Sequence, residues 1–277
     1  YPNPLKVIRQ DDGDFTVDTG TAIYRFDHDK LLPENGWLIS GGQKIQILKG
    51  SGAGAYLLDN TGRTARISGK PAEIENRFIK EGPGRVVVKR SGWYVTHTGE
   101  KLAKADVWFY FSAGTPYFRI THSLIFTENT NKIWLKDYGL EFKTPDKPSE
   151  VYCAAGENSE EIRKVSNLGG EIFLLQSEYP HFMEREYKAT IGKSVNGKDN
   201  IVEGIKTAGD WAHGDYGNYG ITLVMPWLAE RYPKEISFGD RGARAVLWSG
   251  RSGKELDFRA KTLVREYFQE WAIRGLK

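Results

Sequence analysis

Apolar and polar residues alternate along short segments of this chain, which is the pattern of half-buried β-strands. The clearest case is a hairpin over residues 105–111 and 117–126, with the turn sequence Ala113-Gly114-Thr115-Pro116 between its arms. In the second arm one face is expected to carry Phe118, Ile120, His122, Leu124 and Phe126, and the other Tyr117, Arg119, Thr121 and Ser123. Further strands are predicted near residues 15–26, 45–48, 71–79, 86–88, 138–143, 171–177, 219–225 and 243–248. Regular short strands of this kind predict an all-β chain built around a large antiparallel β-sandwich.

Glycine and proline divide this pattern into parts. The cluster from Glu81 to Gly84 interrupts strand pairing, so we expect a small first domain over residues 1–82 and a sandwich domain over residues 83–260. Residues 261–277 are expected to form a C-terminal amphipathic helix, because Leu263, Tyr267, Phe268 and Trp271 have helical spacing. One or two helical turns are also predicted over residues 226–232, before Pro233.

Composition and short motifs exclude several kinds of functional site. The 277 residues include 13% aromatic side chains and carry a formal charge of +3, with basic and acidic residues interspersed, so we expect no nucleic-acid arm. Cys153 is the single cysteine, which excludes an internal disulfide and a thiolate zinc cluster. The run from Asp11 to Asp14 resembles part of a calcium loop without its downstream glutamate. No phosphate loop, dinucleotide fingerprint or serine-hydrolase elbow occurs, so neither a cofactor nor a metal is predicted.

The N-terminus and the lengths of the apolar runs bear on targeting and on membrane insertion. The chain opens on Tyr1-Pro2-Asn3-Pro4 with neither an initiator methionine nor an apolar signal region, so a mature or trimmed product is expected. No stretch approaches the roughly 18 consecutive apolar residues of a membrane-spanning helix, and no membrane span is predicted.

Six stretches of the chain have a pattern shared with a known family. They are Trp108 to Phe126, Asp137 to Phe142, Asp14 to Ala22, Tyr219 to Val224, Tyr232 to Glu235 and Leu247 to Ser249. With these stretches the chain resembles the rhamnogalacturonan exolyase and YetA-like family from about Asp14 to Arg259. The resemblance implies that residues 1–82 form a small β-barrel-like domain and that the sandwich follows. In that family an α/α toroid comes next and forms much of the catalytic cleft, whereas this sequence ends at Lys277.

The resemblance also implies a function. It is that of a polysaccharide lyase acting on acidic, uronate-containing polysaccharides, secreted or at the cell surface, with an acidic polysaccharide or oligosaccharide as its partner. A C-terminal α/α domain or a second chain would complete its cleft.

The densest polar and aromatic stretch runs from Asp210 to Tyr219. Its glycines predict a tightly bent loop that presents aromatic and hydrogen-bonding side chains, as a sugar-binding loop does. A lyase needs a base and a cation for the uronate carboxylate. The predicted catalytic residues are His213 and Tyr216, and the predicted substrate-binding residues in this loop are Trp211, Asp215 and Tyr219. The alternative is a connecting loop in which the tryptophan packs inward and the aspartate caps a turn.

Other candidates lie elsewhere. His181, in an aromatic segment, and Arg185, which follows it, are predicted substrate contacts, and Arg119 faces away from the apolar side of its strand. Either arginine suits a carboxylate, because a guanidinium binds one through two parallel hydrogen bonds. His122 is instead predicted to be a satisfied histidine on an apolar face. Two further functions stay open on the sequence, a non-catalytic carbohydrate-binding module and a structural surface or assembly protein built on a β-sandwich.

Overall fold

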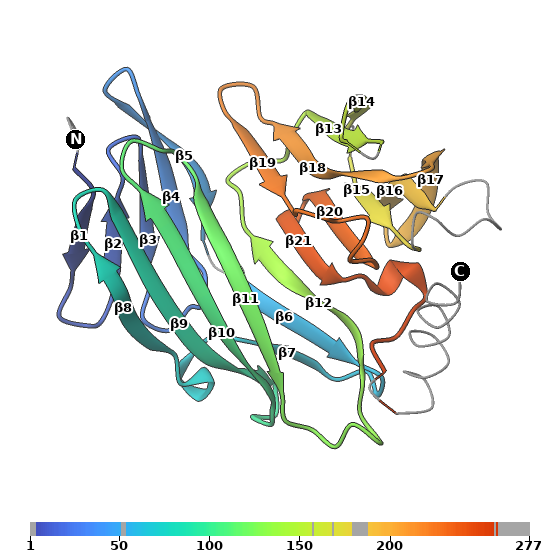
Figure 1. The fold of residues 1–277 in the computed structure, drawn as a ribbon, viewed down its shortest axis with the longest axis horizontal. Coiled ribbons are helices and arrows are strands. Elements are labelled where there is room, and N and C mark those ends of the chain that lie inside the picture. The colour runs from blue at the N-terminus through green and yellow to red at the C-terminus, as the bar shows by residue number, and fades with distance from the viewer. Residues whose placement is uncertain are drawn as a thin grey trace, which may run out of the picture.

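The computed structural model describes residues 4–50, 54–156, 158–167, 169–178, 188–257 and 259. These residues form three antiparallel β-sheets of five, twelve and four strands, with two short 3-10 helices, η1 (Lys70–Ala72) and η2 (Gly250–Ser252) (Figure 1). The all-β sandwich expected from the sequence is therefore confirmed. Among the described residues, no helix has the length and apolar character needed to cross a lipid bilayer. The predicted helix over residues 261–277 lies outside the described residues.

The five-stranded sheet is a simple meander in the order β1-β2-β3-β4-β5. Its strands are β1 (Lys6–Arg9), β2 (Phe15–Asp18), β3 (Ala22–Phe26), β4 (Asn35–Ser40) and β5 (Gln43–Lys49). Alternate residues of β2 and β3 are buried, among them Phe15, Val17, Tyr24 and Phe26. One face of this sheet is thus apolar and needs a partner layer.

The twelve-stranded sheet supplies that layer. It has the order β11-β10-β9-β7-β6-β12-β21-β20-β15-β16-β17, with β8 paired to β9. Its strands are β6 (Gly54–Asp59), β7 (Thr64–Arg66), β8 (Glu75–Glu81), β9 (Arg85–Thr96), β10 (Lys101–Ser112), β11 (Phe118–Phe126), β12 (Leu135–Phe142), β15 (Glu171–Gln176), β16 (Ala189–Val195), β17 (Lys198–Ile205), β20 (Lys234–Gly239) and β21 (Gly242–Trp248). The predicted hairpin is β10–β11, and its second arm alternates between half-buried and mostly exposed residues as expected.

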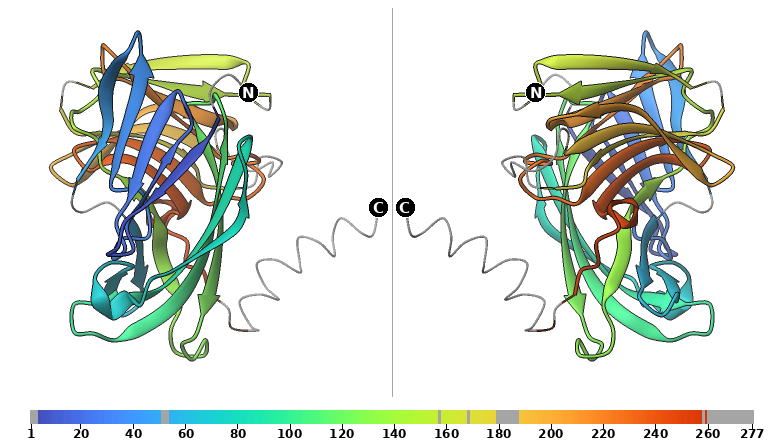
Figure 2. Two further views of the ribbon diagram at one scale, coloured as in Figure 1. Left: turned by 90° about the vertical axis from the view of Figure 1, so that its left-hand side faces the viewer. Right: turned by 90° about the vertical axis from the view of Figure 1, so that its right-hand side faces the viewer.

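Aromatic rings join these two sheets. Phe15 and Phe26 stack on each other at 4.7 Å between ring centroids, and Phe26 packs edge-on against Phe109 of β10 at 5.1 Å. Tyr24 meets Phe118 of β11 at 4.7 Å. The side views show β1–β5 and β8–β11 as facing layers (Figure 2). The apolar faces of both layers therefore point inward, and the opposite face of β8–β11 points to solvent.

The four-stranded sheet lies over the other half of the large sheet. It has the order β14-β13-β18-β19, with β13 (Glu150–Ala155), β14 (Glu161–Ser166), β18 (Ala208–Asp215) and β19 (Gly220–Val224). Its inner face carries buried Cys153 and Ala212, and Gly214 lies against Phe238 of β20. Its outer face is free to present polar side chains.

Two sequence-based expectations concern residues 226–232 and the boundary at residue 82. Residues 226–231 form hydrogen-bonded turns: the Arg231 amide donates to the Trp227 carbonyl at 3.0 Å, a bond with the spacing of one helical turn, but the φ of 57° at Trp227 is not helical, so no regular helix forms. Strands β6, β7 and β8, which precede residue 82, pair within the large sheet. The division of the chain at residue 82 stays a prediction.

Candidate functional site on the outer face of the small sheet

The segment predicted as a glycine-rich loop is mostly strand. Residues 208–215 form β18 and residues 220–224 form β19, so the loop prediction for Trp211, His213 and Asp215 was wrong. The glycines explain the difference. A Cβ atom on Gly214 would lie 2.8 Å from the Phe238 ring, and one on Gly209 would lie 2.5 Å from the Ala154 Cβ. Gly214 thus allows close packing against the large sheet, and Gly209 allows close approach to the paired strand β13, so neither glycine serves to bend the chain.

Strand geometry nevertheless brings the predicted residues together. Trp211, His213 and Asp215 are half-buried and alternate with buried Ala212 and Gly214, so they share the outer face of the sheet. A loop would have presented them in no fixed relation to one another. On β18 they follow each other at intervals of about 7 Å, set by the strand repeat.

A polar row crosses the sheet at His213. Its neighbours in register are Tyr152 on β13 and Thr222 on β19, and Lys164 on β14 lies beyond Tyr152. The His213 and Tyr152 rings are 6.1 Å apart, and His213 Nδ1 lies 2.8 Å from Thr222 Oγ1. Lys164 Nζ is 5.7 Å from the Tyr152 ring. The row therefore offers aromatic, hydroxyl, imidazole and ammonium groups on one surface.

Glu150 of β13 contacts two residues of this row, Tyr152 and Lys164. Its carboxylate accepts the Tyr152 hydroxyl at 2.8 Å and pairs with Lys164 Nζ at 2.6 Å. The hydrogen bond from Lys164, with a second from Tyr152, lowers the pKa of Glu150, and Glu150 in turn raises the pKa of Lys164. Both groups are consequently charged at neutral pH, and the Tyr152 phenol is held in a fixed direction.

Gly220 makes room for the imidazole. It lies opposite Asp215 on β19, and a Cβ atom there would fall 2.3 Å from His213 Cε1. The ring thus lies across a strand position that has no side chain. With Nδ1 bonded to Thr222, the ring orientation is fixed, and within the described residues no hydrogen-bond partner is found for Nε2.

Tyr216 and Tyr219 close the turn between β18 and β19. Their rings stack at 4.6 Å and 7°, and the Tyr216 amide donates to the Tyr219 carbonyl. Asp215 Oδ1 accepts a hydrogen bond from the Gly217 amide at 2.8 Å. This is the turn-capping role that the alternative hypothesis of a connecting loop predicts for the aspartate. Burial raises the pKa of Tyr216 and raises that of Tyr219 to about 12. Both phenols are protonated at neutral pH, and both hydroxyls are buried on the core side of the sheet, so neither predicted residue lies on the outer face with His213.

The remaining predicted residues are not part of this face. Arg119 is exposed on β11 of the large sheet, with its guanidinium 5.8 Å from the Tyr110 ring. His181 and Arg185 lie outside the described residues. The site as described therefore consists of Trp211, His213 and Asp215 with the cross-strand neighbours that sequence reasoning missed, namely Glu150, Tyr152, Lys164 and Thr222.

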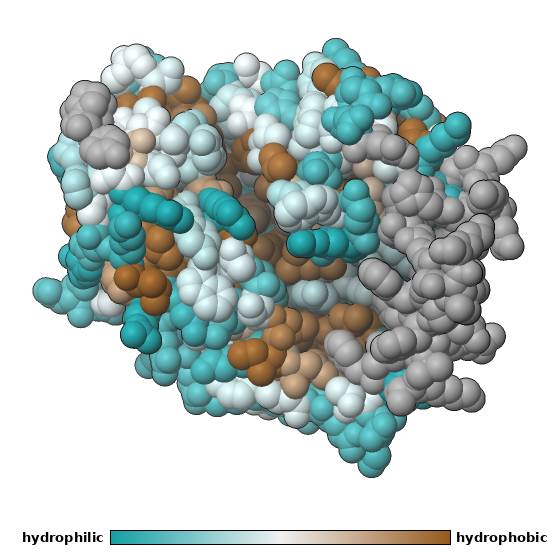
Figure 3. All heavy atoms as spheres, viewed as in Figure 1, coloured by the Kyte–Doolittle hydropathy of each residue, from teal (hydrophilic) through white to brown (hydrophobic). Residues whose placement is uncertain are grey.

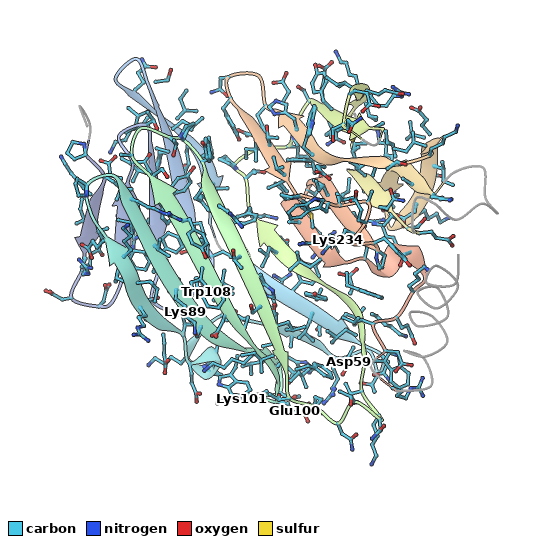
Figure 4. The ribbon with its side chains drawn as sticks, in the orientation of Figure 1. Asp59, Lys89, Glu100, Lys101, Trp108 and Lys234 are labelled. Atoms are coloured by element: carbon cyan, nitrogen blue, oxygen red, sulfur yellow. The ribbon has the colours of Figure 1, made fainter. Side chains whose placement is uncertain are left out.

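The surface is hollowed between β11 and the strands β19–β21 (Figure 3). Two titratable side chains outside the small sheet, His122 of β11 and Lys234 of β20, interact electrostatically. His122 Nε2 lies 3.1 Å from the Tyr94 hydroxyl, which agrees with its prediction as a satisfied histidine, and burial lowers its pKa to about 4. Lys234 Nζ donates to the Leu247 carbonyl at 3.1 Å, and burial lowers its pKa to about 8 (Figure 4). A lysine at the start of a strand is usually solvated, so sequence reasoning had no signal by which to identify Lys234.

The acidic turn near the N-terminus is already satisfied by protein groups. Asp12, Asp14 and His28 have ligand atoms within 4.8 Å of one another. The buried Asp14 carboxylate accepts Arg25 Nη2 at 3.0 Å and the His28 amide at 2.8 Å, and His28 Nδ1 lies 2.9 Å away. The bond to Asp14 raises the pKa of His28. Positive charge from the protein thus occupies the place that a cation would take.

A comparison with protein families gives one match. A model described as "PcRGLX-like protein central beta sandwich domain" matches residues 18–153, about half of the chain. This part of the chain is similar to a rhamnogalacturonan lyase-like β-sandwich domain, which supports that part of the resemblance, while the YetA-like assignment stays a prediction. The match begins in β2, crosses residue 82 and ends in β13. No curated protein matches the chain.

Proposed function

We propose that this chain is the β-domain part of a secreted or cell-surface carbohydrate-active enzyme of the polysaccharide lyase type. Its substrate class is an acidic polysaccharide that contains uronic acids, and an α/α domain or a second chain completes its cleft. The outer face of the small sheet holds the sugar. The similarity of residues 18–153 to a rhamnogalacturonan lyase-like sandwich supports a polysaccharide as the ligand.

The observation that carries the proposal is the row through His213. Aromatic rings stack on the apolar faces of sugars, while hydroxyl and charged groups beside them fix the sugar hydroxyls. Tyr152 and Trp211 supply rings, and Thr222, Glu150 and Lys164 supply the polar groups. Elimination beside a carboxylate also needs a cation for the carboxylate and a base for the neighbouring proton. Lys164 and His213 fit these two roles.

Replacing Trp211 by alanine is expected to weaken binding of a rhamnogalacturonan oligosaccharide about tenfold, or ~1.4 kcal/mol, because a stacking surface is lost. Isothermal titration calorimetry on the purified chain measures this change. Trp227→Ala is the matched control, because Trp227 is 57% exposed on the turn after β19 and belongs to no row of the sheet. Equal affinities of the wild type and the Trp211 variant would refute this face as the sugar site.

A second experiment separates a lyase from a binding module. Unsaturated uronates absorb in the ultraviolet, so an active chain incubated with rhamnogalacturonan should show a rise in absorbance with time. His213→Ala is expected to lower this rate at least about 100-fold, the contribution of a general base. Thr222→Val, which removes only the hydroxyl that orients the ring, should lower it less. Binding without any rise in absorbance would assign the chain to the non-catalytic module.

A further inference from the structure

The outer face of β8–β11 carries aromatic and cationic side chains that the described site does not use. We name it the basic aromatic face. Its aromatic members are Trp93, Trp108 and Tyr110, and its cationic members are Arg85, Lys89, Lys104 and Arg119. Pairing places them on one side of the sheet, because Lys104 lies opposite Trp93, Trp108 opposite Lys89, and Tyr110 opposite Arg119. Figure 4 shows Trp108 and Lys89 on this side, toward the viewer.

Each aromatic ring of this face has a cation close to it. Lys89 Nζ lies 5.1 Å from the Trp108 ring, and Lys104 Nζ lies 5.8 Å from the Trp93 ring. Tyr110 has two cations, with Arg85 at 5.5 Å and Arg119 at 5.8 Å. Cation–π contacts position the charged groups beside flat apolar surfaces without neutralising them.

Part of the positive charge on this face is uncompensated, since Asp106 interacts electrostatically with Lys89 and Lys104 but not with the two arginines. Within the described part of the chain, Arg85, Lys104 and Arg119 have no carboxylate within 4.0 Å. Lys89 pairs with Asp106 at 2.7 Å, yet it also lies directly opposite Arg77 of β8. Like charges directly opposite each other destabilise a sheet, and the Asp106 carboxylate offsets this repulsion at Lys89.

We infer that the basic aromatic face binds a linear, uronate-containing polysaccharide, as a second contact surface separate from the small sheet. This inference rests on the proposed function. The two guanidinium groups beside Tyr110 suit uronate carboxylates, which arginine binds through paired hydrogen bonds, and Trp108 suits the apolar face of a sugar. Rows of the sheet repeat about every 7 Å along the strands, so successive rows contact successive parts of one extended chain.

The position of the face in the sequence supports the same ligand class. Residues 77–119 lie wholly within the segment that matches the rhamnogalacturonan lyase-like sandwich, whereas the His213 row draws β18 and β19 from outside it. A nucleic acid would also meet the positive charge, and the experiment below includes it as a competing ligand.

The test uses the full chain and a double variant, Arg85→Ala with Arg119→Ala. We expect this variant to bind an oligogalacturonate about tenfold more weakly and to reduce the slope of log affinity against log salt by about two, one for each lost cation. Binding of the fully methyl-esterified, uncharged oligosaccharide should not change. The control is Lys147→Ala with Lys198→Ala, which lowers the net charge equally at exposed positions on other parts of the surface. Circular dichroism confirms that both variants are folded.

The outcomes separate the inference from the proposed function. If the wild type binds the oligogalacturonate, Trp211→Ala weakens it and the double arginine variant does not, the inference is overturned while the proposed function stands. Failure of the wild type to bind any acidic oligosaccharide would overturn both. Preference of the wild type for a single-stranded DNA of equal charge, lost in the double arginine variant, would overturn the polysaccharide as occupant.

Discussion

The Glu235→Ala variant is expected to unfold with a free energy about 3–5 kcal/mol below that of the wild type, the range found when one partner of a buried ion pair is removed. Glu235 lies on β20 and is 1% exposed. Its carboxylate accepts Ser249 Oγ at 2.7 Å and lies 3.2 Å from Arg251 Nε. Removing it leaves a buried hydroxyl and part of a guanidinium without their acceptor.

Arg251, the partner of Glu235, also contacts residues on two other strands, so the substitution is expected to disturb more than one contact. It belongs to η2, directly after β21, and also pairs with Glu171 of β15 at 2.6 Å and with Asp199 of β17. Its guanidinium lies 4.4 Å from the Phe173 ring. Burial raises the pKa of Glu235 even though Arg251 opposes this. Burial thus disfavours the charged carboxylate while the arginine contacts favour it, and these contacts hold the segment after β21 against three strands.

Equilibrium unfolding in urea, monitored by tryptophan fluorescence, gives the free energy difference. Asp199→Ala is the matched control, because Asp199 pairs with the same arginine but its side chain is 44% exposed. It is expected to cost less than about 1 kcal/mol, as exposed ion pairs do. A loss of less than 1 kcal/mol for Glu235→Ala would contradict the buried network as a source of stability.

Local periodicity accounts for the parts of the fold that were predicted correctly. The alternation from Phe118 to Phe126 specifies both a strand and its buried face, because a period of two has one geometric solution. The loop prediction from glycine failed at Gly214. A glycine that bends a turn and a glycine that admits a neighbouring layer are identical in sequence, and only the position of Phe238 against Gly214 distinguishes them.

The candidate site was predictable only along one strand. Trp211, His213 and Asp215 are close in sequence, and once β18 is a strand they must share a face. Tyr152 and Lys164 lie about sixty and about fifty residues before His213 in the sequence, and their positions follow from the pairing of β13 with β14 and β18. The basic aromatic face also depends on pairing between strands. Arg119 was identified by its direction, but its neighbour Tyr110 required the register of β10 and β11.

The second large effect is expected at Arg90, which is fully buried on β9 between the two sheets. Its guanidinium lies 5.4 Å from the Phe15 ring and 5.3 Å from the Phe26 ring. Nη2 donates to the Asp27 carbonyl at 2.8 Å and to the His28 carbonyl at 3.4 Å, so one side chain ties β9 to the turn after β3. Arg90→Ala should lower the free energy of unfolding by about 3–5 kcal/mol, because it leaves a large cavity and unpaired carbonyls.

The Arg90→Met variant separates the effect of losing side-chain volume from the effect of losing the guanidinium charge. Among the described residues, Nε and Nη1 of Arg90 have no hydrogen-bond partner, and burial lowers the pKa of this guanidinium to about 9, so holding the charge here is costly. Methionine fills most of the same space without that cost, and we expect a loss of about 1–2 kcal/mol by urea unfolding. If methionine is as damaging as alanine, the bonds to the Asp27 and His28 carbonyls dominate. A smaller loss for methionine means that the two sheets are held together here mainly by packing, with the guanidinium accommodated at a cost.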